Sequence, residues 1–227
     1  MSGTFSPCME ILPLAQRRLW PELKPAAELG FVLYGGTAIA LRLGHRASVD
    51  FDFFSEKPLD RGLIQMTFPF MARSTVLQDA RNTLSVLVPY GDLEHTQVKV
   101  SFFGTIAFGR VAEPDVTEDG VLQVASLQDL LATKLKVVLQ RAEAKDYRDI
   151  VALLKAGVSL PSGLAAARAI FGPNFQPSES LKAMVFFDDG DLRTLTTDEK
   201  SILVRAVSAV RELPAVEILS RQLQRKL

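Results

Sequence analysis

The chain has 227 residues, the length of one large domain or of one domain and a smaller second one. Its 26 Lys and Arg residues balance its 26 Asp and Glu residues, so the formal net charge is +0. This balance argues against a broad basic surface that grips nucleic acid, although it leaves room for a small basic pocket. With 48% hydrophobic and 23% charged residues, the composition is globular and excludes disorder as the main state.

The cysteine content and the hydropathy pattern indicate a cellular location. Cys8 is the only cysteine, so no intramolecular disulfide can form, and this is typical of a reducing compartment. No apolar run reaches the ~18 residues of a membrane-spanning helix, and the first residues lack the basic and apolar parts of a signal peptide. We therefore expect a cytoplasmic protein without a membrane partner.

The first elements form a compact strand–helix–strand pattern. Apolar residues at helical spacing predict a helix within the first thirty residues, and residues 31–34 then form an apolar run that ends at Gly35 and Gly36. This is the pattern of a buried strand that enters a tight turn. A short helix should follow and end at Gly44. In residues 49–54 apolar and acidic side chains alternate, which predicts a strand.

The middle of the chain favours more strands. Residues 59–71 are predicted to form a helix that Pro69 breaks or ends. Three strand-like runs follow, at 74–77, 83–89 and 97–103. Gly91 and Asp92 are a turn signal between the last two runs and predict a hairpin. Residues 104–122 are expected to be irregular, because they carry proline and Asp-Gly turn chemistry.

Helical patterns dominate the remainder. Ser126 begins a Ser-Leu-Gln-Asp capping pattern before the clearest helix, expected at 126–143, and a second amphipathic helix follows. Further helices are expected at 164–170, 181–187, 200–210 and 216–223. The sequence thus predicts an α+β fold, with a mixed β-sheet core over residues 1–122 and a helical region over residues 123–227.

One cluster of residues points to chemistry. Gly35, Gly36 and Thr37 are followed after twelve residues by Asp50 and Asp52. Two carboxylates at i and i+2 of a strand point to the same side and repel each other, so a fold keeps them where a cation lies between them. Oxygen ligands of this kind suit Mg²⁺ or Mn²⁺. A Gly-Gly turn at a helix N-terminus offers backbone N–H groups to an anion, and the threonine adds a hydroxyl donor. A phosphate cradle beside a metal-binding pair is what a nucleoside triphosphate requires.

Each half of this pattern is common by itself, because Gly-Gly-Thr turns are frequent and exposed edge strands often alternate polar and apolar residues. Here Phe51, Phe53 and Phe54 are interleaved with the two carboxylates. The Phe53–Phe54 pair breaks the alternation, so one face of this strand is not simply solvated. The combination therefore favours a site over an exposed edge strand.

Two stretches resemble a known family. The segment Gly-Gly-Thr-Ala-Ile-Ala-Leu-Arg-Leu-Gly-His-Arg-Ala-Ser-Val-Asp-Phe-Asp-Phe-Phe, residues 35–54, resembles the first motif of the nucleotidyltransferase superfamily with the DNA polymerase β-like fold. It is more closely similar to the AbiEii/AbiGii family, the nucleotidyltransferase-like toxins of bacterial abortive-infection (type IV) toxin–antitoxin pairs. Residues 133–150, which include Lys134, Arg141 and Asp146, resemble the later Lys and Asp motifs of that family.

The resemblance implies a nucleotidyltransferase core and an Mg²⁺-dependent reaction. A nucleoside monophosphate would pass from a nucleoside triphosphate to an acceptor hydroxyl by in-line attack, with pyrophosphate leaving. Asp50 and Asp52 would hold Mg²⁺, while Gly36 and Thr37 would hold the β- and γ-phosphates. The implied context is a toxin that arrests growth, with tRNA or a protein as acceptor and a cognate antitoxin as partner.

The later motif supplies further candidates. Lys134 is the implied charge partner of the phosphates, and the alternative is a surface lysine with its stem along the protein. Asp146 and Asp149 are three apart on a helix and share a face, so one of them would act as base or metal ligand. The alternative is that Asp146 caps the helix and Asp149 pairs with Lys145.

Two residues of the intervening loop are nucleotide-binding candidates. Arg46 would reach a phosphate or an Asp carboxylate, and an intramolecular ion pair is the equal alternative. Ser48 lies in the same loop, where turning the chain is its commonest role.

One position departs from the superfamily pattern. These enzymes usually carry a third carboxylate on a later strand, but the expected strand at 97–103 has Ser101 there, and a serine cannot replace a carboxylate. Three alternatives remain open: a C-terminal Asp supplies the function, one well-held metal suffices, or the domain binds a nucleotide without transferring it. The last alternative would make the protein a regulatory nucleotide-binding protein. A third function that fits is a nucleotidyltransferase that modifies a small molecule such as an antibiotic.

Overall fold

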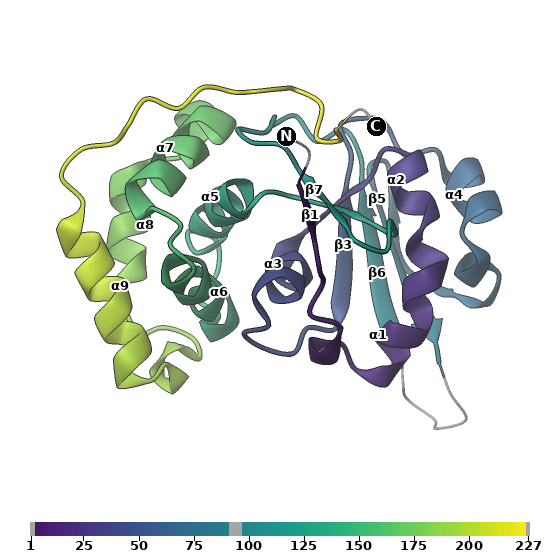
Figure 1. Cartoon of the computed structure of the whole chain (residues 1–227), viewed down its shortest axis with the longest axis horizontal. Coiled ribbons are helices and arrows are strands. Elements are labelled where there is room, and N and C mark those ends of the chain that lie inside the picture. The colour runs from purple at the N-terminus through teal and green to yellow at the C-terminus, as the bar shows by residue number, and fades with distance from the viewer. Residues whose placement is uncertain (1–2, 91–96, 226–227) are drawn as a thin grey trace. The chain divides into compact units, whose positions relative to one another are not determined.

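The computed structural model describes residues 3–90 and 97–225 (Figure 1). The chain forms two compact units. Unit 1 comprises Met1–Gly109, Glu113–Ala125 and Ser220–Leu227, and unit 2 comprises Arg110–Ala112 and Ser126–Leu219. The sequence placed the change between regions at 122/123, whereas the main division in the structure lies at 125/126, and the last eight residues group with unit 1.

Unit 1 is built around a mixed sheet. In chain order its strands are β1 Thr4–Phe5, β2 Val32–Tyr34, β3 Asp50–Phe54, β4 Thr75–Ala80, β5 Thr83–Pro89, β6 Gln97–Phe103, β7 Asp115–Thr117 and β8 Gln123–Val124. Across the described part of the sheet their order is β1-β7-β8-β2-β3-β6-β5-β4. β3 therefore lies inside the sheet, antiparallel to β2 and parallel to β6. This mixed sheet with helices confirms the expected α+β class.

Helices cover both faces of this sheet. They are α1 Leu14–Leu19, α2 Pro25–Glu28, α3 Gly35–Leu43 and α4 Arg61–Thr67, with short 3₁₀ helices at Met9–Ile11, Trp20–Leu23 and Pro69–Arg73. Figure 1 shows α1, α2 and α4 on one side of the sheet and α3 on the other. The first side is an aromatic core, in which the Phe102 ring lies 5.0 Å from that of Phe68 and 5.5 Å from that of Phe53.

Several expected elements are confirmed. β5 and β6 have the expected bounds and pair in antiparallel register, so the hairpin is confirmed, although its turn at Gly91 and Asp92 lies outside the described residues. The helix predicted at 59–71 is divided at Pro69 into α4 and a 3₁₀ helix. Gly44 ends α3 in the left-handed conformation with φ of +62°, where glycine has no side chain to clash.

Three short strands, β1, β7 and β8, were not predicted. Each has only two or three residues, too few to show an alternating pattern. A buried arginine of α3 holds them together: Arg42 Nη1 lies 2.8 Å from Asp115 Oδ2, and Nη2 donates to the Val124 carbonyl at 2.9 Å. Its guanidinium also lies 4.4 Å from the centre of the Phe5 ring. These strands thus depend on a contact between distant residues that no local pattern reveals.

Unit 2 is helical. Its helices are α5 Leu127–Val137, α6 Ala144–Lys155, α7 Leu160–Phe171, α8 Pro177–Met184 and α9 Thr197–Ala209, with 3₁₀ helices at Gly172–Asn174 and Leu192–Thr194. The predicted cap is confirmed, because Ser126 Oγ accepts a hydrogen bond from the Asp129 backbone N–H at 3.0 Å. α5 ends earlier than expected, at Val137 rather than near residue 143.

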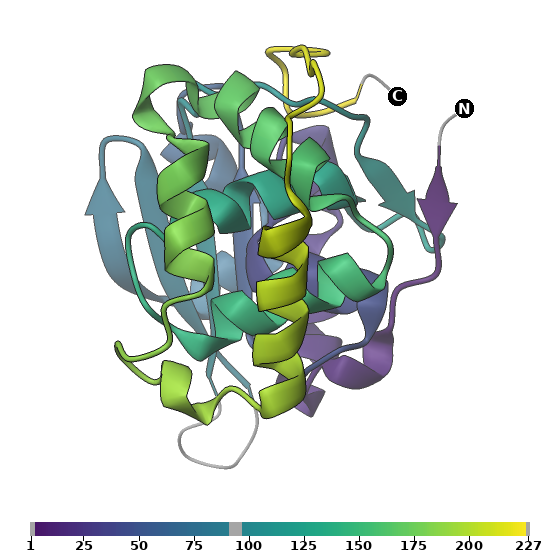
Figure 2. The same ribbon diagram turned by 90° about the vertical axis from the view of Figure 1, so that its left-hand side faces the viewer.

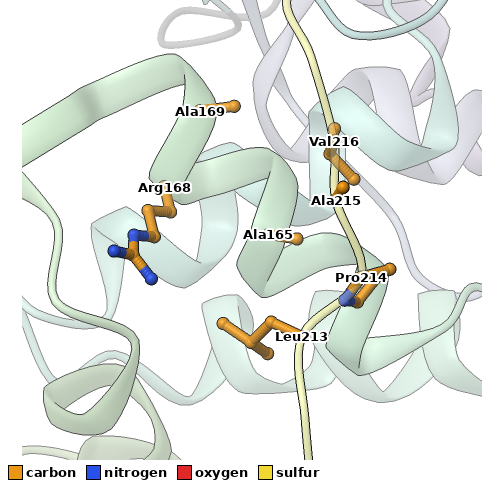
Figure 3. A pocket seen from close by; sticks show the side chains of 7 residues that line it. All are labelled: Ala165, Arg168, Ala169, Leu213, Pro214, Ala215 and Val216. Carbon is orange, nitrogen blue, oxygen red and sulfur yellow. The ribbon is translucent and has the colours of Figure 1, made fainter.

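The helix predicted at 216–223 is wrong. After α9 the described chain contains no further helix, and Figure 2 shows this segment in yellow as an uncoiled trace. In unit 2, Leu213 and Val216 lie along α7, where small side chains such as Ala165 leave a hollow of about 380 Å³ (Figure 3). Leu223 is instead fully buried in unit 1. The apolar residues of this segment therefore contact separate parts of the chain and do not form one face of a helix.

Hydrogen bonds to unit 1 replace those of a helix at the end of the described chain. The Leu223 N–H donates to Glu56 Oε2 at 3.1 Å, and the Arg225 N–H donates to Gln123 Oε1 at 3.0 Å. Among the described residues, none of the helices combines the length and the apolar character that crossing a bilayer requires.

We expect Leu223→Ala to destabilise unit 1 by about 2–5 kcal/mol, because Leu223 is fully buried and its removal leaves a cavity. Urea unfolding followed by Trp20 fluorescence measures this, since Trp20 is the single tryptophan and lies buried in unit 1. Leu219→Ala is the matched control, because Leu219 is 55% exposed, and it should change stability by less than about 0.5 kcal/mol. Equal effects of the two substitutions would contradict the burial of Leu223 in unit 1.

Candidate functional site

The two glycines of the first motif lie where β2 passes directly into α3. Gly35 is the first residue of α3 and has a φ of +77°, which glycine adopts without strain. A Cβ atom on Gly35 would lie 2.8 Å from Asp52 Oδ2, closer than such atoms approach. The Asp52 carboxylate therefore lies directly against bare backbone at the helix start, an arrangement that any larger residue at position 35 would disturb.

Asp50 and Asp52 share one face of β3, as predicted. Both are partly exposed, whereas Phe51 and Phe53 between them are fully buried on the opposite face. Phe54 explains the break in alternation, because its ring stacks on that of Tyr34 with centroids 4.9 Å apart and an interplanar angle of 12°. The carboxylate face thus continues into aromatic side chains at the end of β3.

Two hydroxyl groups hold the start of β3 against α3. Thr37 Oγ1 donates to the Asp50 carbonyl oxygen and lies 2.7 Å from Ser48 Oγ. Both side chains are buried, at 3% and 7% exposure. These hydroxyls, considered from sequence as phosphate contacts, are engaged within the protein and position the carboxylate pair. Arg46 Nη1 donates to the Ala47 carbonyl at 3.0 Å, within the same loop.

The strand β6 lies beside the carboxylate pair. The sheet register places Asp50 next to Lys99 and Asp52 next to Ser101. Ser101 is 1% exposed, and its hydroxyl accepts a hydrogen bond from Ser85 Oγ at 3.1 Å. The position expected for a third carboxylate is therefore directly beside Asp52 and carries a hydroxyl. In the described part of the chain, no three His, Cys, Asp or Glu side chains gather into a metal site.

The residues of the later motif form a separate cluster inside unit 2. Lys134 Nζ lies 2.6 Å from both Asp146 Oδ1 and Asp149 Oδ2. The lysine side chain is 7% exposed and both carboxylates are fully buried. Arg141 Nε lies 2.8 Å from Asp146 Oδ2, so two cations and two anions compensate each other. Lys134 is thus not the surface lysine of the alternative interpretation.

The local alternatives for the two aspartates are also wrong. The N-cap of α6 is Glu143 rather than Asp146. Lys145 pairs with Glu143 at 2.7 Å, and Asp149 pairs with Lys134. Their expected common face is confirmed, because both aspartates contact the same ammonium group.

The charges of the cluster set the pKa of Asp146. Burial by itself would raise the pKa of this carboxyl, but hydrogen bonds and charges from Arg141 and Lys134 outweigh it and hold the pKa below its usual value. Asp146 is therefore ionised at neutral pH. The structure thus brings the candidate residues together in two groups, one within each unit.

The position of Lys99 beside Asp50 was not predicted, because nothing in the alternating pattern of β6 distinguishes a lysine next to the carboxylates from one that faces solvent. Its i, i+2 relation to Ser101 was the available signal, since residues two apart on a strand share a face.

We expect Lys134→Met to destabilise unit 2 by about 3–5 kcal/mol, because it leaves two buried carboxylates without their ammonium partner. Urea unfolding followed by far-UV circular dichroism measures the loss of helix. Lys145→Met is the control, because its side chain is 52% exposed. A Lys134 variant as stable as this control would show that the cluster contributes nothing to the fold.

Comparison with known proteins identifies the family of this chain. Residues 19–200 match the family model described as "Nucleotidyl transferase AbiEii toxin, Type IV TA system". An uncharacterized protein of Aquifex aeolicus (strain VF5) is 31% identical over 162 residues, which cover 70% of this chain and 74% of that protein.

Two solved structures are also similar to this chain. An H. pylori protein assigned as a nucleotidyltransferase has 20% identity and a TM-score of 0.58, over 86% of this chain and 92% of that chain. MenT4, a nucleotidyltransferase toxin of Mycobacterium tuberculosis H37Rv, has 16% identity and a TM-score of 0.49, over 88% and 92% of the two chains. The family match covers both candidate groups of residues, and the chain therefore belongs to the AbiEii toxin family of type IV toxin–antitoxin systems and is a nucleotidyltransferase.

Proposed function

We propose that this chain transfers a nucleoside monophosphate from a nucleoside triphosphate to an acceptor hydroxyl, at the carboxylate pair of β3. The observation that carries the proposal is the close approach of Asp52 to Gly35, with Asp50 on the same face of the strand. It places two carboxylates, which can act as metal ligands, beside the first turn of a nine-residue helix. A divalent cation is attracted to the two carboxylates, and anionic phosphates are attracted to the adjacent helix N-terminus.

The carboxylate pair fits a metal ion that is shared with a substrate. Mg²⁺ commonly binds through one or two carboxylates together with substrate phosphates, and it needs no complete cage of protein ligands. Asp50 and Asp52 supply that number of donors, and Mn²⁺ has the same preference. When bound, the ion would neutralise phosphate charge and polarise the phosphorus that is attacked.

The start of α3 would hold the β- and γ-phosphates. The first N–H groups of a helix have no partner within the helix, and the positive end of its dipole attracts anions. Gly35 and Gly36 carry no side chains that would keep a phosphate away. Thr37 contributes indirectly in this proposal, because its hydroxyl binds the Asp50 carbonyl and fixes β3 beside the turn.

The proposed reaction is a simple displacement. A bond forms between the acceptor oxygen and the α-phosphorus, and the bond from that phosphorus to the bridging oxygen breaks. The electron pair leaves with pyrophosphate, and the proton of the acceptor hydroxyl passes to solvent water. Positioning and charge stabilisation supply most of the rate increase in reactions of this class.

The family supports a wider context. Its members are described as toxins of type IV toxin–antitoxin systems. We propose tRNA or a protein as the acceptor and a cognate antitoxin as a functional partner. If RNA is the acceptor, the net charge of +0 favours contact with an end or a single loop rather than a long duplex.

The later motif has a place in this proposal. Lys134 would be the functional cation of unit 2, with Asp146 and Asp149 holding its ammonium group in place. The support is the pair of 2.6 Å contacts that fix this side chain from two directions.

We expect Asp50→Asn and Asp52→Asn each to lower transfer from a labelled nucleoside triphosphate to total tRNA or lysate protein by about 1,000-fold or more, because each removes an anionic ligand. Asp188→Asn, at an exposed position in unit 2, is the control and should keep full activity.

If the Asp50/Asp52 double variant still labels an acceptor, the proposed site is wrong. Ser101 favours one competing function, a nucleotide-binding protein without transfer. That function predicts triphosphate binding in calorimetry together with an absence of label on any tRNA, protein or aminoglycoside acceptor.

A further inference from the structure

The side of the carboxylate pair that faces β6 carries a lysine. In the parallel register of β3 and β6, Lys99 lies next to Asp50 and Ser101 next to Asp52. Side chains at matched positions of neighbouring strands project from the same face of a sheet. Adjacent strands are ~4.8 Å apart, so the flexible four-carbon stem of Lys99 allows its ammonium group to reach a ligand held at the two carboxylates.

Among the residues that the structure describes, no side chain pairs with the ammonium group of Lys99. Lys99 is partly exposed, and within the described chain it makes no hydrogen bond or ion pair. Lys134 differs, because two carboxylates at 2.6 Å compensate its charge. Since Lys99 forms no closed pair with Asp50, its charge is available to an anion that binds at this face.

The side chains of β6 favour an ammonium group over a second metal ion beside the carboxylate pair. Beside Asp52, where a third carboxylate would hold a second metal ion, the chain has the buried hydroxyl of Ser101. A second divalent ion would therefore find no anionic ligand on β6. An ammonium group needs none, and it supplies positive charge to phosphate oxygens as a compact point charge.

We propose that Lys99 is a catalytic residue that supplies, on the β6 side of the site, the positive charge otherwise provided by a second metal ion. This inference rests on the proposed transfer reaction. Lys99 donates hydrogen bonds to oxygens of the transferred phosphoryl group while the bond to the acceptor oxygen forms and the bond to pyrophosphate breaks. It keeps its proton throughout, and its contribution grows as negative charge accumulates on those oxygens.

The first test compares three variants under single-turnover conditions with labelled nucleoside triphosphate. Lys99→Gln removes the charge and should slow transfer by about 100-fold or more. Lys99→Arg retains the charge and should recover at least about a tenth of the activity. Lys24→Gln, at an exposed position of unit 1, is the charge-matched control and should leave the rate unchanged. Trp20 fluorescence confirms that each variant is folded.

The second test does not depend on turnover. Electron paramagnetic resonance counts Mn²⁺ ions bound in the presence of a non-hydrolysable triphosphate analogue. We expect one ion per chain in the unmodified protein and in Lys99→Gln, with analogue binding at least about 10-fold weaker in Lys99→Gln and unchanged in Lys24→Gln. Two tightly bound ions in the unmodified protein would overturn the proposal.

The two proposals fail in different ways. If the unmodified protein transfers nucleotide in an Asp50-dependent reaction and Lys99→Gln is as fast, the Lys99 assignment is wrong and the reaction stands. If no acceptor is labelled, the transfer reaction is wrong, and analogue binding then decides whether Lys99 contacts the phosphates. Equal analogue affinity in Lys99→Gln and Lys24→Gln would reject that contact as well.

Discussion

The site depends on the approach of the Asp52 carboxylate to the bare backbone of Gly35, where β2 turns into α3. A carboxylate is stabilised near a helix N-terminus, so this contact lowers the cost of holding two acids on one strand face. The fold fixes it from both sides. Phe51 and Phe53 bury the opposite face of β3, and the Thr37 hydroxyl binds the Asp50 carbonyl. The geometry of the site is thus a consequence of core packing.

The two charged groups of the chain differ in how their charges are compensated. In unit 2, the buried carboxylates of Asp146 and Asp149 are compensated by the buried Lys134 and the more exposed Arg141. On β3 the two carboxylates lie on a partly exposed face, where the proposed metal ion would offset their negative charge. A formal net charge of +0 therefore describes a chain with a polarised site and says little about its substrates.

Local patterns predicted the elements that position the site, and long-range contacts formed those that the patterns missed. The alternation in β3 and the glycine turn before α3 are local signals, and both are confirmed. The short strands that Arg42 joins are formed by contacts between residues far apart in sequence. The helix expected at 216–223 failed for the same reason, because Leu223 is buried in unit 1. The pairing of Lys134 with both aspartates likewise could not be predicted from a local pattern, because the fold brings these residues together.

The most direct test of the central claim compares Gly35→Ala with Gly44→Ala in the labelled transfer assay. Both glycines have a positive φ, +77° and +62°, so both substitutions carry backbone strain. Only a Cβ at position 35 would meet Asp52, at 2.8 Å from Oδ2, whereas at position 44 it would lie 3.3 Å from Cys8 Sγ. We expect Gly35→Ala to lose about 100-fold in transfer rate and Gly44→Ala to remain active. Equal activity of the two folded variants would contradict the account.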